Sequence, residues 1–420
     1  MVELERIQPW MLLRDSRCNT LLRILRIGQP WAGSIVVDGQ DQLGNHAEIT
    51  LSRSDETYLQ AVSHVPRLRR DPAAVLGCLL AGAAGDALGA PVEFLRWPEI
   101  ERQFGARGGV VDFVPAYGRL GAITDDTQMM LFTAEGLLRA WVCGVSRGIC
   151  HPPSIIHHAL LRWLLTQGEP AATAVGQDGW LFGERRLWSR RAPGDTCLSA
   201  LRASRRFGEP ADNAGKGGGG VMRVAPCAFF PGAFDKAAES ARLTHGHPTG
   251  YLAAGLFADI LARLWRDEKA SLLEATRAGL AEHGGRPGME ETRRLVERVL
   301  AVHAEGAKPT PQGIEQLGGG WVAEEALAIG LWCALGAGSL EEGLIRAVNH
   351  GGDSDSTGLI AGHFLGLLHG PEAIPAHWLD ELELRDVIER IALDLCLVPG
   401  SYRADGSEAS RAIGERYPGW

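Results

Sequence analysis

The sequence has little of what several large classes of protein require. Lys and Arg number 42 against 51 Asp and Glu, a formal net charge of −9, so the basic excess of a dedicated nucleic-acid binder is missing. No stretch approaches the roughly 18 uninterrupted apolar residues of a membrane-spanning helix. Residues 1–5 are acidic where a signal peptide is basic and then apolar. We therefore expect a soluble, cytoplasmic protein that has neither a membrane nor a nucleic acid as its main partner.

Cysteine occurs without a metal-binding pattern. The eight cysteines never form a C-x-x-C pair, which argues against a zinc cluster. Cys78 and Cys333 stand in apolar runs and are typical of small core residues, so we expect reduced thiols. The composition is otherwise that of a globular chain, with 45% hydrophobic and 22% charged residues. A length of 420 residues allows one large domain or two ordinary ones.

Residues 1–71 differ from the rest of the chain in their pattern of apolar and charged residues. Between 12 and 27, four arginines interleave with Leu and Ile. Residues 34–37 and 47–51 are predicted to form two short strands joined by a turn-rich loop. Residues 52–70 are polar and end in Arg67, Arg69 and Arg70, which suits a surface linker. Because so short a segment holds little core by itself, we predict an N-terminal extension that leans on the main body or on a partner.

Residues 72–420 are predicted to form one large all-α domain. Pro72 suits the first position of a helix, and the residues from 73 to 90 are almost wholly small and apolar. Glycine and proline clusters separate the further helices, and no repeat of 20–50 residues is evident. Those helices are predicted at 127–142, 154–166, 196–206, 234–243, 249–266, 271–283, 289–304, 322–336, 339–348, 357–369 and 384–396.

Two acidic clusters, more than two hundred residues apart, each precede an apolar helical stretch. They are Thr124-Asp125-Asp126-Thr127 and Asp353-Ser354-Asp355-Ser356-Thr357. Helix capping is the simpler interpretation, but a cap needs one such group and each cluster offers several. An EF-hand is excluded because its twelfth position, Phe364, cannot supply the bidentate glutamate. All-oxygen ligands indicate magnesium, manganese or calcium, and four acids in one site favour a pair of ions.

Three further stretches carry polar groups in unusual places. Asp86 and Glu93 interrupt an apolar helix, where each carboxylate is either satisfied locally or faces a polar pocket. The glycine run at 215–220 lacks the Walker spacing and is either a flexible loop or a loop that approaches a phosphate closely. His245 and His247 precede a helix and do not fit a zinc-binding pattern.

Taken together, these stretches resemble the ADP-ribosylglycohydrolase family, of the type that activates dinitrogenase reductase. The resemblance covers about 72–400 and rests on GDALGAPVEF (85–94), TDDTQM (124–129), KGGGGVMRVAP (216–226), THGHPTGYLAA (244–254) and NHGGDSDSTG (349–358). It implies a large orthogonal all-α bundle with two Mg²⁺ or Mn²⁺ ions in a central cleft. It also implies cleavage of the glycosidic bond between ADP-ribose and a modified protein side chain, most of all arginine, or a related ADP-ribosyl compound.

The resemblance also assigns roles to individual residues. The metal ligands it implies are Thr124, Asp125, Asp126, Asp353, Asp355 and Ser356, the last replacing a threonine of many members. Glu93 matches the acidic residue near the metals, and one of Glu93, Asp125 and Asp355 would move the proton that activates water or frees the leaving group. The substrate-binding residues it implies are Gly215, Lys216, Gly217, Gly218 and Gly219 at the diphosphate, His245 near the ADP moiety and Asp195 near the distal ribose.

The extension departs from the plain family pattern. Some bacterial relatives that confer immunity to ADP-ribosyltransferase toxins carry an N-terminal extension that blocks the toxin, and residues 1–70 are compatible with that arrangement. The alternatives are an accessory segment that packs on the core or on a second copy. Three functions therefore stay open: removal of ADP-ribose from protein, stoichiometric binding of a toxin, and hydrolysis of small ADP-ribosyl compounds or ADP-ribosylated nucleic acid.

Overall fold

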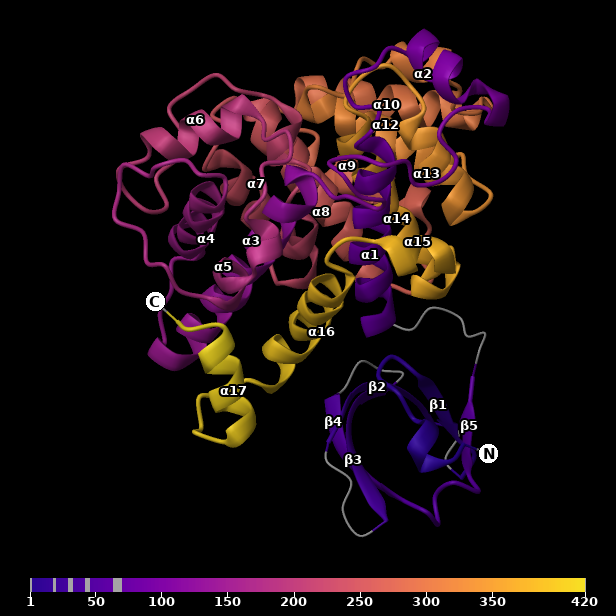
Figure 1. Ribbon diagram of the computed structural model, residues 1–420, viewed down its shortest axis with the longest axis vertical. Helices are drawn as coiled ribbons and strands as arrows, with labels where there is room; N and C mark the ends of the chain where they lie inside the picture. The colour runs from indigo at the N-terminus through magenta and orange to yellow at the C-terminus, as the bar shows by residue number, and fades with distance from the viewer. Residues whose placement is uncertain (1, 18–19, 29–32, 42–45, 63–69, 420) are drawn as a thin grey trace.

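The computed structural model describes residues 2–17, 20–28, 33–41, 46–62 and 70–419 (Figure 1). The strands are β1 (Leu12–Asp15), β2 (Thr20–Ile27), β3 (Ser34–Asp41), β4 (His46–Ser52) and β5 (Leu59–Ala61). The first α-helices are α1 (Pro72–Gly89), α2 (Trp97–Phe104), α3 (Asp125–Arg147), α4 (Pro152–Thr166), α5 (Trp180–Gly183), α6 (Asp195–Ala203), α7 (Ala233–Arg242) and α8 (Pro248–Arg266). Next come α9 (Leu272–His283), α10 (Glu290–Ala304), α11 (Pro311–Glu315), α12 (Ala323–Leu335), α13 (Leu340–Val348), α14 (Ser354–His369), α15 (Ala376–Glu381), α16 (Arg385–Ser401) and α17 (Glu408–Arg416). Short 3₁₀ helices are η1 (Leu4–Arg6), η2 (Gly105–Arg107), η3 (Arg185–Leu187), η4 (Gly218–Gly220), η5 (Ala225–Phe229) and η6 (Pro371–Ala373).

The extension is more ordered than the sequence indicated. The hairpin is confirmed, since β3 and β4 pair antiparallel from Ser34↔Ser52 to Gln40↔His46. It supplies, however, only two strands of a five-stranded antiparallel sheet of order β4-β3-β2-β1-β5. The prediction of a polar linker was wrong at residues 59–61, which form β5, while residues 63–69 lie outside the described part of the chain. The expectation of little independent core was also wrong, because ten buried apolar residues of the extension pack together.

Strand β2 explains why the sheet was missed. Leu22 and Ile24 point into the extension's own apolar cluster, whereas Leu25 packs against Leu393 and Leu397 of α16. A strand buried on both faces reads as a nearly continuous apolar run and loses the alternation that marks a half-exposed strand. The arginines that interrupt the apolar run of β2 are typical of a cationic surface, yet Arg23 is buried.

The helical body agrees with the all-α prediction. Each predicted helix is present with ends shifted by at most a few residues, and the short helices α2, α5, α11, α15 and α17 were not predicted. Among the described residues beyond the extension, β pairing is limited to isolated bridges such as Gly217↔Val322. Helix α1 is long and apolar enough to cross a membrane, but all of it is buried, as in the central helix of a globular fold.

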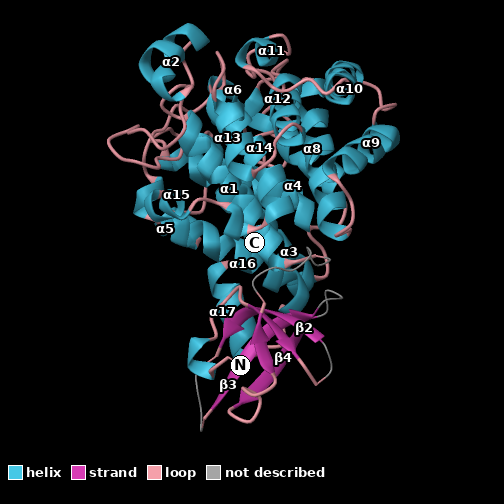
Figure 2. Cartoon of the chain, turned by 90° about the vertical axis from the view of Figure 1, so that its right-hand side faces the viewer, coloured by secondary structure: helices cyan, strands magenta, loops and turns pink. Residues whose placement is uncertain are grey.

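Helices α1 and α14 run antiparallel in such close contact that glycine is required between them. A Cβ at Gly85 would lie 2.1 Å from the carbonyl oxygen of Gly358, and one at Gly89 would lie 2.4 Å from the backbone nitrogen of Asp355. This packing fixes the end of α1 against the start of α14. The extension lies at the other end of α1, beside α16 and α17 (Figures 1 and 2). Because α1 has 18 residues, about 27 Å separates its two ends.

Candidate active site

The two acidic clusters meet at the starts of α3 and α14. The hydroxyl of Ser356 donates a hydrogen bond of 2.7 Å to Oδ2 of Asp126, across 230 positions of sequence. Thr124 and Asp353 are the N-cap residues of these helices, and both are buried. The capping interpretation therefore holds in part, because the Thr124 hydroxyl accepts the N–H of Asp126 at 3.3 Å. The Asp353 side chain makes no capping hydrogen bond to α14, so capping does not account for its carboxylate.

Glu93 joins this group from the turn after α1. Glu93, Asp353 and Asp355 each place a carboxylate oxygen within 4.8 Å of the others, and all three residues are buried. Oε2 of Glu93 is buried without a hydrogen-bond partner among the described residues. The structure thus brings together Glu93 and members of both clusters.

The acids share an electrostatic environment that disfavours their ionised forms. Burial, followed by repulsion from Asp355, raises the pKa of Asp125, Asp126 and Asp353 well above the ordinary range. The same two causes raise the pKa of Glu93 to about 10. Among the described residues, none of these acids has a basic side chain within 4.0 Å. Buried carboxylates of this kind are stabilised by cations, and an all-oxygen donor set fits a hard divalent ion.

Asp86 orients the first of the clusters, a role that the sequence did not reveal. Both of its carboxylate oxygens accept the N–H of Thr124 at 3.0 Å, and Oδ2 accepts the Thr127 hydroxyl at 2.5 Å. The first of the two interpretations of Asp86 is therefore correct, because neighbouring groups satisfy its carboxylate with hydrogen bonds. These bonds fix the turn from which Asp125 and Asp126 project. The available signal was a single carboxylate inside an otherwise apolar helix.

The glycine run lies against the acids. A Cβ at Gly218 would stand 3.1 Å from Oδ2 of Asp353, so the backbone of the loop borders the acidic group directly. The N–H of Gly218 donates to the carbonyl of Trp321 at 3.1 Å, which holds the loop in place. Lys216 is directed elsewhere, since its Nζ forms ion pairs with Glu291 at 2.7 Å and with Glu324 at 2.6 Å.

The predicted substrate residues beyond this loop have different environments. His245 is buried with its Nδ1 2.8 Å from the Thr244 hydroxyl, and burial followed by the charge of Arg223 lowers its pKa to about 3. Its ring faces the loop, because a Cβ at Gly219 would be 3.3 Å from the His245 ring. Asp195 is the exposed first residue of α6, and the preceding Gly194 donates its N–H to Asp125 at 3.4 Å.

Three residues to which sequence reasoning gave no role complete the surroundings of the site. Buried Arg223 donates to the carbonyl of Gly219 at 2.9 Å and to the Thr244 hydroxyl at 2.7 Å, so it ties the glycine loop to the histidine segment. At the rim, the exposed rings of Phe94 and Trp321 stack with centroids 5.9 Å apart. This stack connects the Glu93 turn with the strand-like segment that holds Gly218.

Comparison with known proteins assigns this all-α body, with its buried acids at two helix starts and the glycine loop beside them, to a known enzyme family. The family model for ADP-ribosylglycohydrolase matches residues 67–404, and the chain belongs to that family. Enzymes of the family hydrolyse glycosidic bonds of ADP-ribose. Residues 1–66 lie outside the matched region.

Individual relatives have low sequence identity to this chain but match it over about three quarters of its length. An uncharacterised protein of Archaeoglobus fulgidus is 28% identical over 76% of this chain and 94% of its own length. The ADP-ribosyl-[dinitrogen reductase] glycohydrolase of Rhodospirillum rubrum is 26% identical over 74% of this chain and 90% of its own. The ADP-ribosylarginine hydrolase Tri1 of Serratia proteamaculans is 24% identical over 76% and 78%. A solved ADP-ribosylglycohydrolase-related protein complex has a chain that is 29% identical, with a TM-score of 0.57 over 79% of this chain and 99% of that one.

Proposed function

We propose that this protein is a divalent-metal-dependent hydrolase that removes ADP-ribose from modified protein side chains, with ADP-ribosyl-arginine as its main substrate. The observation that carries the proposal is the convergence of the two acidic clusters, joined by the Ser356–Asp126 hydrogen bond and extended by Glu93. The names of relatives that act on arginine support the choice of linkage. The cysteines support a cytoplasmic location, because none of the seven that the structure describes forms a disulfide.

The metal-binding residues are those that the clusters place together. We assign Thr124, Asp125, Asp126, Asp353, Asp355 and Ser356 to two Mg²⁺ or Mn²⁺ ions. Bound there, such ions would bind ribose hydroxyls, polarise the anomeric centre and lower the pKa of a water ligand. The carboxylates supply the charge that makes the site attractive to cations, and Asp86 holds one of the two helix starts in register.

The protein's own groups account for binding and proton transfer. In the loop from Gly215 to Gly219 only Lys216 has a side chain, and it is directed elsewhere, which suits close contact of the backbone with a diphosphate. The N–H groups of Gly215 and Gly218 already donate to Asn213 and Trp321, so the remaining N–H groups of the loop would make that contact. His245 is neutral at physiological pH and therefore acts through hydrogen bonding near the ADP moiety. One carboxylate among Glu93, Asp125 and Asp355 takes the proton of the attacking water or gives one to the leaving nitrogen.

The test measures ADP-ribose released from arginine-modified protein, serine-modified protein and free ADP-ribosyl compounds at equal enzyme concentration. We expect fastest release from the arginine linkage, loss of activity with a chelator, and recovery when Mg²⁺ or Mn²⁺ is restored. Asp125→Asn and Asp353→Asn should each lose activity, whereas Asp380→Asn at an exposed site should not. Full activity in either cluster variant would contradict the metal assignment, and a preference for free compounds would contradict the substrate.

A partner-binding role for residues 1–70 is the second candidate. It is favoured by the separate apolar core of the extension and by its position at the opposite end of α1 from the acidic site, a helix about 27 Å long. The proposed partner is an ADP-ribosyltransferase toxin. If binding dominates, the Asp125→Asn protein will inhibit the transferase at one-to-one stoichiometry. If catalysis dominates, only the unaltered protein will reverse the modification, and the transferase will keep its rate.

A further inference from the structure

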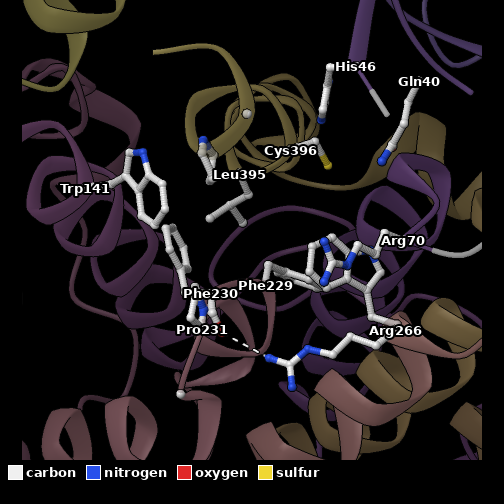
Figure 3. A pocket seen from close by; sticks show the side chains of 14 residues that line it. Gln40, His46, Arg70, Trp141, Phe229, Phe230, Pro231, Arg266, Leu395 and Cys396 are labelled. Atoms are coloured by element: carbon white, nitrogen blue, oxygen red, sulfur yellow. Dashed lines mark hydrogen bonds between the residues drawn. The ribbon is translucent and has the colours of Figure 1, made fainter. Parts of the chain in front are cut away.

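A cavity of about 630 Å³ lies where the extension meets the helical body (Figure 3). Gln40 and His46 enter it from β3 and β4, and Arg70 stands just before α1. The helical body contributes the ends of η5 and α8 and the C-terminal half of α16. The cavity is therefore at the extension end of α1, remote from the acidic site, and it shares no residue with that site.

The charged side chains that line the cavity are basic. Its fully ionised side chains are Arg70 and Arg266, and no carboxylate is among the described residues that line it. Arg266 makes one long hydrogen bond, 3.4 Å, to the carbonyl of Phe230. Neither guanidinium has a carboxylate within 4.0 Å in the described part of the chain. Two guanidinium groups without counter-ions beside one cavity favour an anionic ligand, and their planar donor groups match phosphate.

The remaining walls are aromatic. Trp141 and Phe230 lie with ring centroids 5.9 Å apart, and Phe229 and Trp265 meet edge to face at 5.2 Å. The guanidinium carbon of Arg70 is 5.9 Å from the centre of the Trp265 ring. Flat aromatic surfaces with a cation nearby bind nucleobases by stacking and dispersion. The volume also falls within the range of about 300–1,000 Å³ that is usual for small-molecule sites.

We propose that this cavity binds a small nucleotide, with its base against the aromatic side chains and its phosphates between Arg70 and Arg266. A nucleotide is the class of ligand that combines a planar ring with a dense negative charge in this volume. The site is separate from the hydrolase site and stands independently of the proposed activity. Because β3 and β4 form one wall, a bound nucleotide contacts the extension and the helical body together.

The first measurement is calorimetric titration of the full-length protein with ADP, adenosine and pyrophosphate. ADP should bind at least tenfold more tightly than either fragment, since it alone engages both the rings and the guanidinium groups. Arg266→Glu should weaken ADP binding about tenfold or more, the effect of removing a charge-assisted hydrogen bond. Arg277→Glu, an exposed change on α9 outside the cavity, should leave it unaltered. Arg70→Glu is the second test, should Arg266→Glu fail to fold.

The second measurement locates the ligand, since ADP could also enter the hydrolase site. Photolabelling with 8-azido-ADP and peptide mapping should mark segments 229–232, 265–266 or 395–400. Three results would each overturn the proposal. They are label confined to 215–221 and 244–249, unchanged affinity in both arginine variants, and no binding at millimolar ADP. Equal affinity for pyrophosphate and ADP would do the same, because the aromatic walls would then play no part.

Discussion

The guanidinium of Arg23 binds both carboxylate oxygens of Asp71, with Nε–Oδ1 at 3.1 Å and Nη2–Oδ2 at 3.0 Å. Both side chains are buried. Asp71 is also the N-cap of α1, where its Oδ1 accepts the N–H of Ala73 at 3.0 Å. One carboxylate therefore starts the central helix and fastens the extension to it. The acidic site is at the far end of the same helix.

Replacing Arg23 with methionine should destabilise the protein by about 3 kcal/mol, because it leaves a buried charge without its partner. Urea unfolding measures the loss, and hydrogen exchange should show faster exchange in β1 and β2. Arg26→Met is the matched control, since Arg26 pairs with Asp38 at an exposed position, and it should cost about 1 kcal/mol or less. The double change Arg23→Met with Asp71→Ser keeps a helix cap without the charge and should recover part of the loss. Equal effects of Arg23→Met and Arg26→Met would contradict this account.

Asp86→Asn should reduce metal affinity and kcat/KM by about 10- to 100-fold, the usual range for groups that orient metal ligands. The amide has one acceptor oxygen and would turn N–H groups toward the donors on Thr124 and Thr127. Chelator-buffered metal titrations and rate measurements at each metal concentration make the comparison. A positioning role predicts that excess metal restores part of the rate. Unchanged metal affinity in a folded variant would show that Asp86 is dispensable for the site.

Gly218→Ala should raise KM about tenfold while the fold is kept, because the added methyl would stand 3.1 Å from Oδ2 of Asp353. Gly218 is not in the left-handed region, so the backbone accepts alanine and the effect is steric. Gly183→Ala is the control, since a Cβ there meets nothing within 4 Å. Steady-state kinetics on the arginine-modified substrate decide the point. A normal KM would place the substrate away from this loop.

Stability should fall as the pH falls from about 6.5 toward 4, in part through buried His157. Burial, and then the charge of Arg223, lowers the pKa of His157 to about 4. The unfolded chain, with a pKa near 6.5, binds the proton more readily in this range, so acid favours unfolding. For this one group the loss is about 2 kcal/mol by pH 5.

His157→Asn tests that contribution. In the wild type, Nδ1 of His157 accepts the N–H of Gly208 at 3.0 Å, and the amide oxygen of asparagine can still accept it. Urea midpoints are compared between pH 7 and pH 5 for the wild type and the variant. The variant should lose less stability on acidification, whereas His377→Asn at an exposed site should behave as the wild type. Parallel pH profiles for His157→Asn and the wild type would refute the assignment.

Much of this protein is specified by local sequence. The helical periodicity and the Gly and Pro punctuation gave the positions of α3, α8 and α14 to within a few residues, because an apolar stripe and its end signals are local properties. The excess of acids at 124–127 and 353–357 predicted a joint site for the same reason, and the structure joins them through Asp126 and Ser356. The division into domains at residue 71 stays a prediction.

Tertiary structure decided the rest, since those features depend on partners distant in sequence. Strand β2 was hidden because both of its faces are buried, one by the extension and one by α16. Asp86 gained its role from Thr124 and Thr127, and Arg223 from Gly219 and Thr244, pairings that no local pattern encodes. The basic cavity exists only because the extension is docked beside α8 and α16. Sequence alone determined which residues could do chemistry, and long-range packing determined which of them meet.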